Sequence, residues 1–138
     1  MLDCIFCKIS SKEIKSRVVF ETENSLAFLD AFPLAVGHTL VIPKQHHKKI
    51  QDLPSEINSD LFSTVVTVVK KIDTLTGATL IAIHNGEDGG QEIPHVHVHI
   101  IPRSKNDNAG PVHRMFNETP KISDSKLDEL CRELQVSQ

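Results

Sequence analysis

The chain has 138 residues, a net charge of −3 and an isoelectric point near 6.2, and 39% of its residues are hydrophobic. This length and apolar content fit one folded domain, whereas the acidic balance argues against nucleic acid as a partner. No apolar run approaches the ~18 residues of a membrane span, so no membrane partner is expected. The chain starts without the basic and apolar segments of a signal peptide, and three cysteines without such a segment favour a reducing compartment. We therefore expect a cytoplasmic protein that can also be nuclear.

Short strands are predicted in the first third of the chain. Residues 17–21 and 25–30 flank the polar turn 22–24, which predicts a hairpin. A third strand is expected at 38–43, where a proline ends the ladder.

Residues 55–76 carry two conflicting signals. The run Val65–Val69 favours a strand by propensity. Apolar residues nevertheless recur at helical spacing over the whole segment, at Leu61, Val65, Val68, Ile72 and Leu75. With Ser55 as a candidate cap and Gly77 as a stop signal, we predict a helix.

The second half is expected to add two strands, a long loop and a helix. Strands at 79–84 and 95–101 flank a loop at 85–94, and residues 103–122 are polar and rich in turn formers. A short amphipathic helix follows around 127–134, packed on the body or on a partner subunit. We predict a single α+β domain over 1–138, with an antiparallel sheet, a motif-bearing core at 3–103 and a C-terminal extension at 104–138.

The most informative segment is His95-Val-His-Val-His99. In a strand, alternate side chains share a face, so three imidazoles would stand in a row about 6.6 Å apart. The row could be an incidental polar face, could hold a metal, or could act on a phosphate. The ligands of one metal ion must converge, whereas side chains two residues apart on the same face of a flat strand diverge, which weakens the metal alternative. Imidazole is a nucleophile near pH 7, so phosphate chemistry fits better, with the central His97 as the nucleophile.

The loop before this strand supports phosphate binding. Gly86, Gly89 and Gly90 let backbone N–H groups turn toward an anion, although such a loop alone is more often a plain turn. Gln91 could position a water or a leaving oxygen.

These motifs together resemble the histidine triad (HIT) nucleotide-binding family. The match comprises His-φ-His-φ-His-φ-φ at 95–101, Gly-His-Thr-Leu-Val-Ile-Pro-Lys at 37–44, Gly-Gln at 90–91 and Cys-Ile-Phe-Cys at 4–7. It runs in order through residues 3–103. The resemblance is to the Hint branch, the purine nucleoside phosphoramidases, in its zinc-containing subgroup. It implies a five-stranded antiparallel sheet with one long helix and a short C-terminal helix.

The resemblance also implies roles for individual residues. In the family the middle histidine attacks the α-phosphate and forms a nucleotidyl-histidine, which assigns the nucleophile to His97. His99 would contact the phosphate and assist the leaving group, while His38 would hydrogen-bond within the site. The implied nucleotide-binding residues are Phe6, Ile9, Phe28, Asp30, Ala31, His84, Asn85, Gly90, Gln91 and Glu92. Considered singly, the apolar members could be core residues, Asp30 a turn cap and His38 an ordinary strand residue.

A metal site is the second implication. Cys4-x-x-Cys7 alone is compatible with zinc, redox chemistry or chance, and zinc needs two more ligands. The resemblance supplies His46 and His95, with His47 as a substitute if the register differs. We expect a structural zinc that ties the N-terminus to the sheet, the alternative being paired buried thiols. The third cysteine, Cys131, is expected in the core.

Three departures from the family pattern concern the substrate. His84 stands where Asn is common, Glu92 stands where Ser or Thr is common, and the strand ends Ile-Pro-Arg at 101–103. A carboxylate near phosphate is unfavourable unless it points away or is protonated.

Three functions follow as alternatives. The first is hydrolysis of adenosine 5′-phosphoramidates through His97, and the second is hydrolysis of dinucleoside polyphosphates. The third is a nucleotide-binding scaffold protein with weak or no catalysis. In each case the expected partner is an AMP-like purine nucleotide, and the resemblance implies a homodimer.

Overall fold

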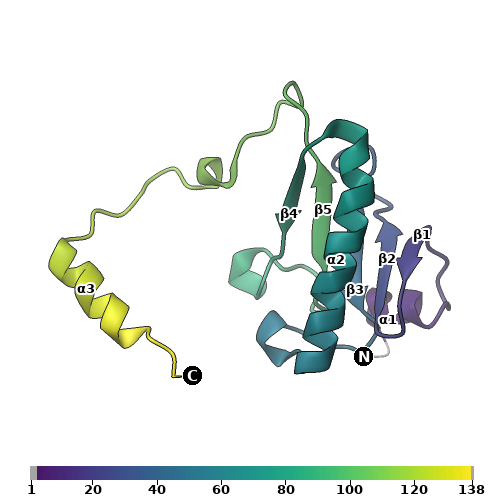
Figure 1. Cartoon of the computed structure of the whole chain (residues 1–138), viewed down its shortest axis with the longest axis horizontal. Helices are drawn as coiled ribbons and strands as arrows, with labels where there is room; N and C mark the ends of the chain where they lie inside the picture. The colour runs from purple at the N-terminus through teal and green to yellow at the C-terminus, as the bar shows by residue number, and fades with distance from the viewer. Residues whose placement is uncertain (1–2, 138) are drawn as a thin grey trace. The chain divides into compact units, whose positions relative to one another are not determined.

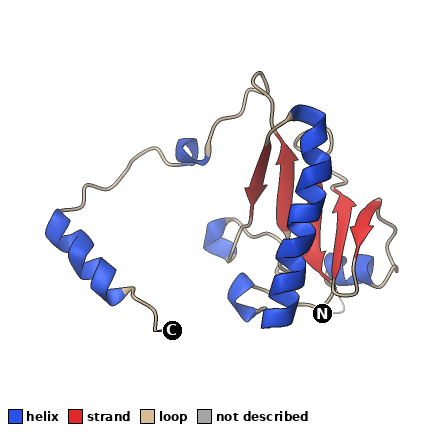
Figure 2. Cartoon of the chain, viewed as in Figure 1, coloured by secondary structure: helices blue, strands red, loops and turns tan. Residues whose placement is uncertain are grey.

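The computed structural model describes residues 3–137, and the chain divides into two compact units, Met1–Asp107 and Asn108–Gln138. The first unit contains the sheet and the long helix (Figures 1 and 2). Its strands are β1 (Val18–Glu21), β2 (Ser25–Leu29), β3 (Thr39–Pro43), β4 (Thr79–Ala82) and β5 (Val98–Pro102). They form one antiparallel sheet in the order β1-β2-β3-β5-β4. This confirms the predicted fold class.

The helix α2 (Ser55–Thr76) has the bounds expected from its periodicity. The β-branched run inside it does not form a strand, because one side of the helix buries its apolar residues against the sheet. The buried positions include Leu61, Val65, Val68 and Ile72. Gly77 ends the helix in the left-handed region at φ 78°, where a residue without Cβ is favoured.

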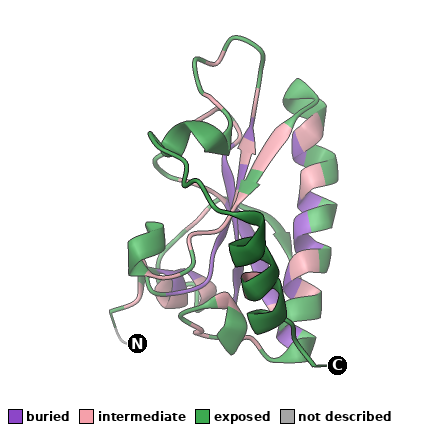
Figure 3. Ribbon diagram, turned by 90° about the vertical axis from the view of Figure 1, so that its left-hand side faces the viewer, coloured by how far each residue is buried: buried purple, intermediate pink, exposed green. Residues whose placement is uncertain are grey.

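The two faces of the sheet carry different apolar clusters, as alternation along the strands requires. On the side of α2, Val41, Val98 and Ile100 pack with the helix residues. On the other side, Leu40 and Ile42 of the same strand β3 pack with a short helix, α1 (Ile5–Ser10). Figure 3 shows the buried residues concentrated in the central strands and on one side of α2.

The sequence did not predict α1, which is a single six-residue helix. Its two buried residues, Phe6 and Ile9, lie three positions apart and close the second apolar cluster. Three short 3₁₀ helices, at Ile50–Asp52, Glu87–Gly89 and Val112–Met115, were also not expected. Segments this short give little periodicity to detect.

Two predicted strands are shorter than expected. The strand predicted from His95 begins at Val98, because its pairing with β3 ends at Val41. The Val96 N–H instead donates to the His47 carbonyl at 2.7 Å. The strand predicted to reach His84 ends at Ala82, whose partner is His99.

The second unit contains α3 (Asp124–Glu133), close to the predicted C-terminal helix. The Ser123 hydroxyl accepts from the Lys126 N–H at 3.2 Å and caps the helix. No α3 residue is buried, and Cys131 is exposed, so its expected place in the core is wrong. Within residues 3–137, no helix is long and apolar enough to cross a membrane.

Truncation of Leu61, which is fully buried between α2 and the sheet, tests this account of the core. We expect Leu61→Ala to lower the free energy of unfolding by about 2–5 kcal/mol, since it leaves a cavity. Lys70→Ala, at an exposed position of the same helix, should change it by less than about 0.5 kcal/mol. Urea denaturation followed by circular dichroism measures both, and equal effects would contradict the packing described.

Candidate functional site

A cavity of about 480 Å³ opens on the face of the sheet opposite α2, within the usual size range of ligand pockets. One part of its wall is apolar, and here Phe6 and Phe28 meet edge to face with ring centroids 6.0 Å apart. The other part carries acidic and imidazole side chains. These are Asp30, His38, His84, His97, His99 and Glu92. The cavity therefore joins an apolar slot to a cluster of groups able to handle an anion.

The alternation around β5 places His97 and His99 in this cavity. Val96, Val98 and Ile100 point into the core against α2, so the histidines between them face the opposite side. The His97 and His99 rings lie 5.0 Å apart, centroid to centroid. Although the strand starts later than predicted, the alternation of the triad is kept.

The backbone carbonyl of His95 fixes the protonation of His97. Its Nδ1 lies 2.7 Å from the carbonyl oxygen of His95. Because a carbonyl only accepts, Nδ1 carries the proton and Nε2 keeps its lone pair. Burial also lowers the pKa of His97. A neutral imidazole with an unprotonated Nε2 thus faces the cavity.

A chain of hydrogen bonds sets the proton positions on His38 and His99. The Leu34 N–H donates to Nδ1 of His38 at 3.1 Å, so the His38 proton is on Nε2. This Nε2 donates to Nδ1 of His99 at 3.0 Å. The neutral His99 consequently carries its proton on Nε2 and can donate it as a hydrogen bond.

Burial keeps these imidazoles uncharged. It lowers the pKa of His38, against the opposing effect of Asp30, whose carboxylate lies 3.6 Å from His38 Nε2. It lowers the pKa of His99 to about 4, and the neighbouring histidines add to the effect. At neutral pH the site therefore offers one nucleophilic nitrogen and one N–H donor rather than two cations.

His84 lies beside this pair. Its ring meets the His99 ring edge on, with the ring centroids 5.4 Å apart, and it lies against the backbone of Gly90. A Cβ on Gly90 would come within 3.2 Å of the His84 ring, and Gly90 has φ +94°. A glycine at position 90 thus leaves room for the larger histidine at position 84.

The structure brings some predicted binding residues to the cavity and not others. Those that line it are Phe6, Ile9, Phe28, Asp30, Ala31, His84, Gly90 and Glu92. The Asn85 side chain instead accepts from the Ile50 N–H and donates to Gln51. Gln91 accepts from the Gly86 N–H at 2.8 Å and donates to the Lys48 carbonyl at 2.7 Å. Both amides hold the loop in place and do not line the cavity.

Sequence reasoning missed five lining residues, all apolar. They are Ile5, Phe32, Leu34, Leu40 and Ile93. Leu40 is one of several apolar residues on β3, and the sequence pattern of a strand does not distinguish a residue in a cavity wall from a residue in the core. The run Ala-Phe-Pro-Leu-Ala-Val at 31–36 did carry a signal, because six apolar residues in a loop are unusual.

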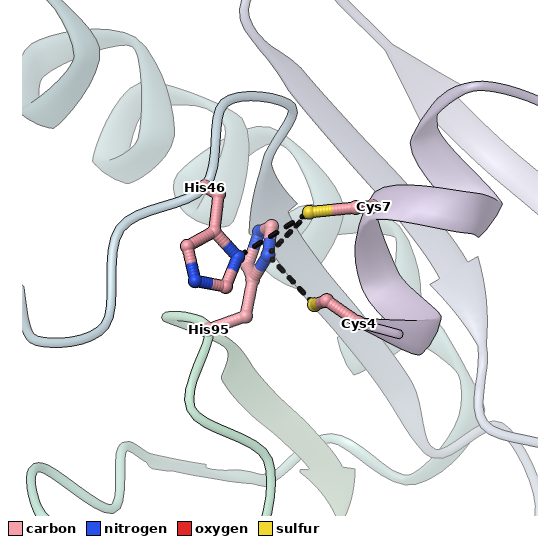
Figure 4. A group of neighbouring side chains, drawn as sticks. All are labelled: Cys4, Cys7, His46 and His95. Carbon is pink, nitrogen blue, oxygen red and sulfur yellow. Dashed lines mark hydrogen bonds between the residues drawn. The ribbon is translucent and has the colours of Figure 1, made fainter. Parts of the chain in front are cut away.

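The four predicted metal ligands form a second cluster next to the cavity (Figure 4). Helix α1 and the residue before it bring Cys7 and Cys4 to His46 and His95, and the four ligand atoms lie within 4.8 Å of one another. Nδ1 of His95 lies 3.5 and 3.6 Å from the two sulfurs, and Nδ1 of His46 lies 3.3 Å from Cys7 Sγ. In a tetrahedral zinc site, sulfur and nitrogen ligands are roughly 3.5 Å apart.

The orientation of His95 also fits a metal. Its Nε2 lies 2.8 Å from the Pro43 carbonyl and must carry the proton, so the unprotonated Nδ1 points at the sulfurs. Burial raises the pKa of the Cys7 thiol and lowers the pKa of His95 to about 4. A bound cation would favour the thiolate and the neutral imidazole alike. His47, the suggested substitute, lies outside this cluster.

Comparison with known proteins gives the family. The HIT domain model matches residues 11–106. An uncharacterized HIT-like protein of Methanocaldococcus jannaschii, MJ0866, is 41% identical over 95% of this chain and 98% of its own length. Adenosine 5′-monophosphoramidase HNT1 of Saccharomyces cerevisiae is 43% identical over 72% of this chain and 62% of the relative.

Two further comparisons concern activity and fold. A bis(5′-nucleosyl)-tetraphosphatase of Schizosaccharomyces pombe is 44% identical over 68% of this chain and 53% of the relative. A histidine triad nucleotide-binding protein of Candida albicans superimposes with a TM-score of 0.83 at 31% identity, over 96% of this chain and 94% of that one. The named phosphoramidase and tetraphosphatase are hydrolases, which confirms the enzyme class predicted for this chain. This chain belongs to the HIT domain family.

Proposed function

We propose that this chain hydrolyses adenosine 5′-phosphoramidates through a covalent nucleotidyl intermediate on His97. The observation that carries the proposal is the hydrogen bond from His97 Nδ1 to the His95 carbonyl, which leaves Nε2 unprotonated in the cavity. The relatives named adenosine 5′-monophosphoramidase favour the P–N bond as the one that is cleaved.

The reaction proceeds in two displacements. Nε2 of His97 bonds to the α-phosphorus as the P–N bond breaks, and the leaving nitrogen takes a proton from solvent. The Nε2–H of His99 donates to a phosphate oxygen and stabilises the charge that builds on it. Water then attacks the phosphorus and the P–Nε2 bond breaks. The oxygen of the water stays on AMP and its two protons go to solvent, which balances the proton taken by the leaving nitrogen and the second proton that converts the released amine into ammonium.

The nucleoside is placed by the rest of the cavity. Phe6, Ile9 and Phe28 supply the apolar slot for the purine. The Asp30 carboxylate lies in the same wall and can accept from both ribose hydroxyls. His38 acts through His99, whose proton it keeps on Nε2.

A zinc ion held by Cys4, Cys7, His46 and His95 completes the proposal. The ion would have a structural role, because two thiolates and two imidazoles fill a tetrahedron and leave no position for a substrate. Bound there, it ties α1 to the start of the triad segment. Since α1 supplies Phe6 and Ile9 to the cavity, the ion would also hold the purine slot in place.

The homodimer remains a prediction, and exposed apolar side chains of the first unit support it. Val66 and Leu75 of α2 and Ile81 of the edge strand β4 are each about half exposed. A second copy could cover such residues in a symmetric contact.

A second candidate function, hydrolysis of dinucleoside polyphosphates, is favoured by a neighbouring hollow of about 690 Å³. It shares Gly90 and Glu92 with the main cavity and is also lined by Lys48 and Lys49. Among the described residues lining the main cavity there is no Lys or Arg. The two lysines could therefore receive a polyphosphate leaving group.

Replacement of the nucleophile tests the reaction type. We expect His97→Ala to lower kcat for an adenosine phosphoramidate by at least about a thousandfold, because no other group can form the intermediate. AMP binding, measured by equilibrium dialysis, should remain detectable. His113→Ala, at an exposed position of the second unit, is the control and should keep full activity. Turnover by His97→Ala would contradict the assignment.

Comparison of substrates tests the bond that is cleaved. We expect a higher kcat/KM for adenosine 5′-phosphoramidate than for diadenosine tetraphosphate, and Lys48→Ala/Lys49→Ala should leave the former unchanged. Faster cleavage of the tetraphosphate, reduced by the lysine changes, would instead support the second function. If neither compound is cleaved while AMP still binds, the chain is a nucleotide-binding protein.

Metal analysis tests the cluster. The purified protein should contain about one zinc per chain, and Cys7→Ser should lose the metal and unfold at a lower temperature, because zinc binding contributes to folding. Cys131→Ser removes a thiol outside the cluster and should change neither value. Equal zinc content in the wild type and Cys7→Ser would rule out this ligand set.

A further inference from the structure

We propose that Phe32 stacks on the outer face of the bound purine and closes the nucleotide slot from the solvent side. The inference rests on the proposed nucleotide site and names one more residue that contacts the base. The aromatic residues that line this cavity differ in burial.

The inner wall of the slot is built from core residues. Phe6, Ile9 and Phe28 have exposed fractions of 4%, 8% and 3%, and they pack with residues of β2 and β3. They can cover only the side of a base that faces the protein. A planar ring has two faces, so the second face of the purine would stay in water unless another side chain covers it.

Phe32 is the aromatic residue placed to cover that face. It lines the same cavity but is 88% exposed, so it stands at the rim and not in the wall. It follows directly after Asp30 and Ala31, which also line the cavity. Leu34, two residues further on, lines the cavity as well and is 75% exposed. The rim near the proposed ribose carboxylate is thus apolar and unburied.

The loop that carries Phe32 is held in position by the site itself. The Phe32 N–H donates to Oδ1 of Asp30 at 2.8 Å. Further along, the Leu34 N–H donates to Nδ1 of His38, and the His38 N–H donates to the Ala35 carbonyl at 3.0 Å. These bonds fix the backbone of the exposed residues before any ligand arrives, which limits the entropy lost on binding. The Asp30 carboxylate would then accept hydrogen bonds from the ribose hydroxyls and from the Phe32 N–H at the same time.

The kind of ligand follows from this chemistry. An aromatic ring stacks on any base, and the larger surface of a purine gains more than that of a pyrimidine. The inferred contact therefore favours purine nucleotides by stacking area and not by hydrogen bonds to the base edge.

Two Phe32 variants test the inference. The chain contains no Trp and no Tyr, so Phe32→Trp introduces a single indole fluorophore. We expect AMP to quench it saturably, with the Kd found by equilibrium dialysis, whereas ribose 5-phosphate should bind without quenching. Phe32→Ala should raise the Kd for AMP about tenfold, within the range measured for the loss of one base stack. It should leave the Kd for ribose 5-phosphate unchanged, and Phe32→Tyr should restore AMP affinity.

The matched control is Val36, which is 90% exposed in the same loop and does not line the cavity. Val36→Trp should keep its fluorescence when AMP is added, and Val36→Ala should keep its affinity. If AMP binds the wild type but Phe32→Trp is not quenched and Phe32→Ala binds normally, the stacking role is wrong and the proposed function stands. If the wild type does not bind AMP at all, both are wrong.

Discussion

The alternation of side chains along residues 95–100 is the constraint on which the rest of the structure depends. Val96, Val98 and Ile100 are fully or almost fully buried against α2, so the segment cannot rotate or shift by one residue without exposing them. The register that this packing imposes forces the three histidines to the opposite face. The hydrophobic core on one side of the sheet thus determines the chemistry on the other.

The same segment explains why the site can act with neutral imidazoles. The histidines lie among buried apolar residues and close to one another, and both circumstances disfavour a positive charge. Two proton positions are set by backbone groups that can only accept or only donate, the His95 carbonyl for His97 and the Leu34 N–H for His38, and His38 in turn sets that of His99. Backbone groups, which cannot change their protonation, orient the side chains that react.

The parts of this site that the sequence could predict are those with a period or a motif. Helical spacing identified residues 55–76 despite the valine run, and period-two alternation identified the triad. The Cys-x-x-Cys pair found its partners only through family resemblance, because His46 and His95 are distant in the chain. Phe32 could not be found by periodicity, since a rim residue satisfies none, and only the unusual apolar run of its loop at 31–36 marks it. Asn85 and Gln91 show the converse: the family resemblance predicts that both bind the nucleotide, but their side chains hold the loop at 85–94 in place.

His95 connects the two halves of the site. Its ring donates from Nε2 to the Pro43 carbonyl and points Nδ1 at the two sulfurs, while its own carbonyl accepts the proton that orients His97. One residue therefore faces the cysteine cluster with its side chain and His97, the proposed nucleophile, with its backbone. A displacement of the ring would also move the peptide that orients His97, only two residues away. For this reason a metal without an open coordination position can still matter for catalysis, since it would hold His95 where its carbonyl sets the His97 tautomer.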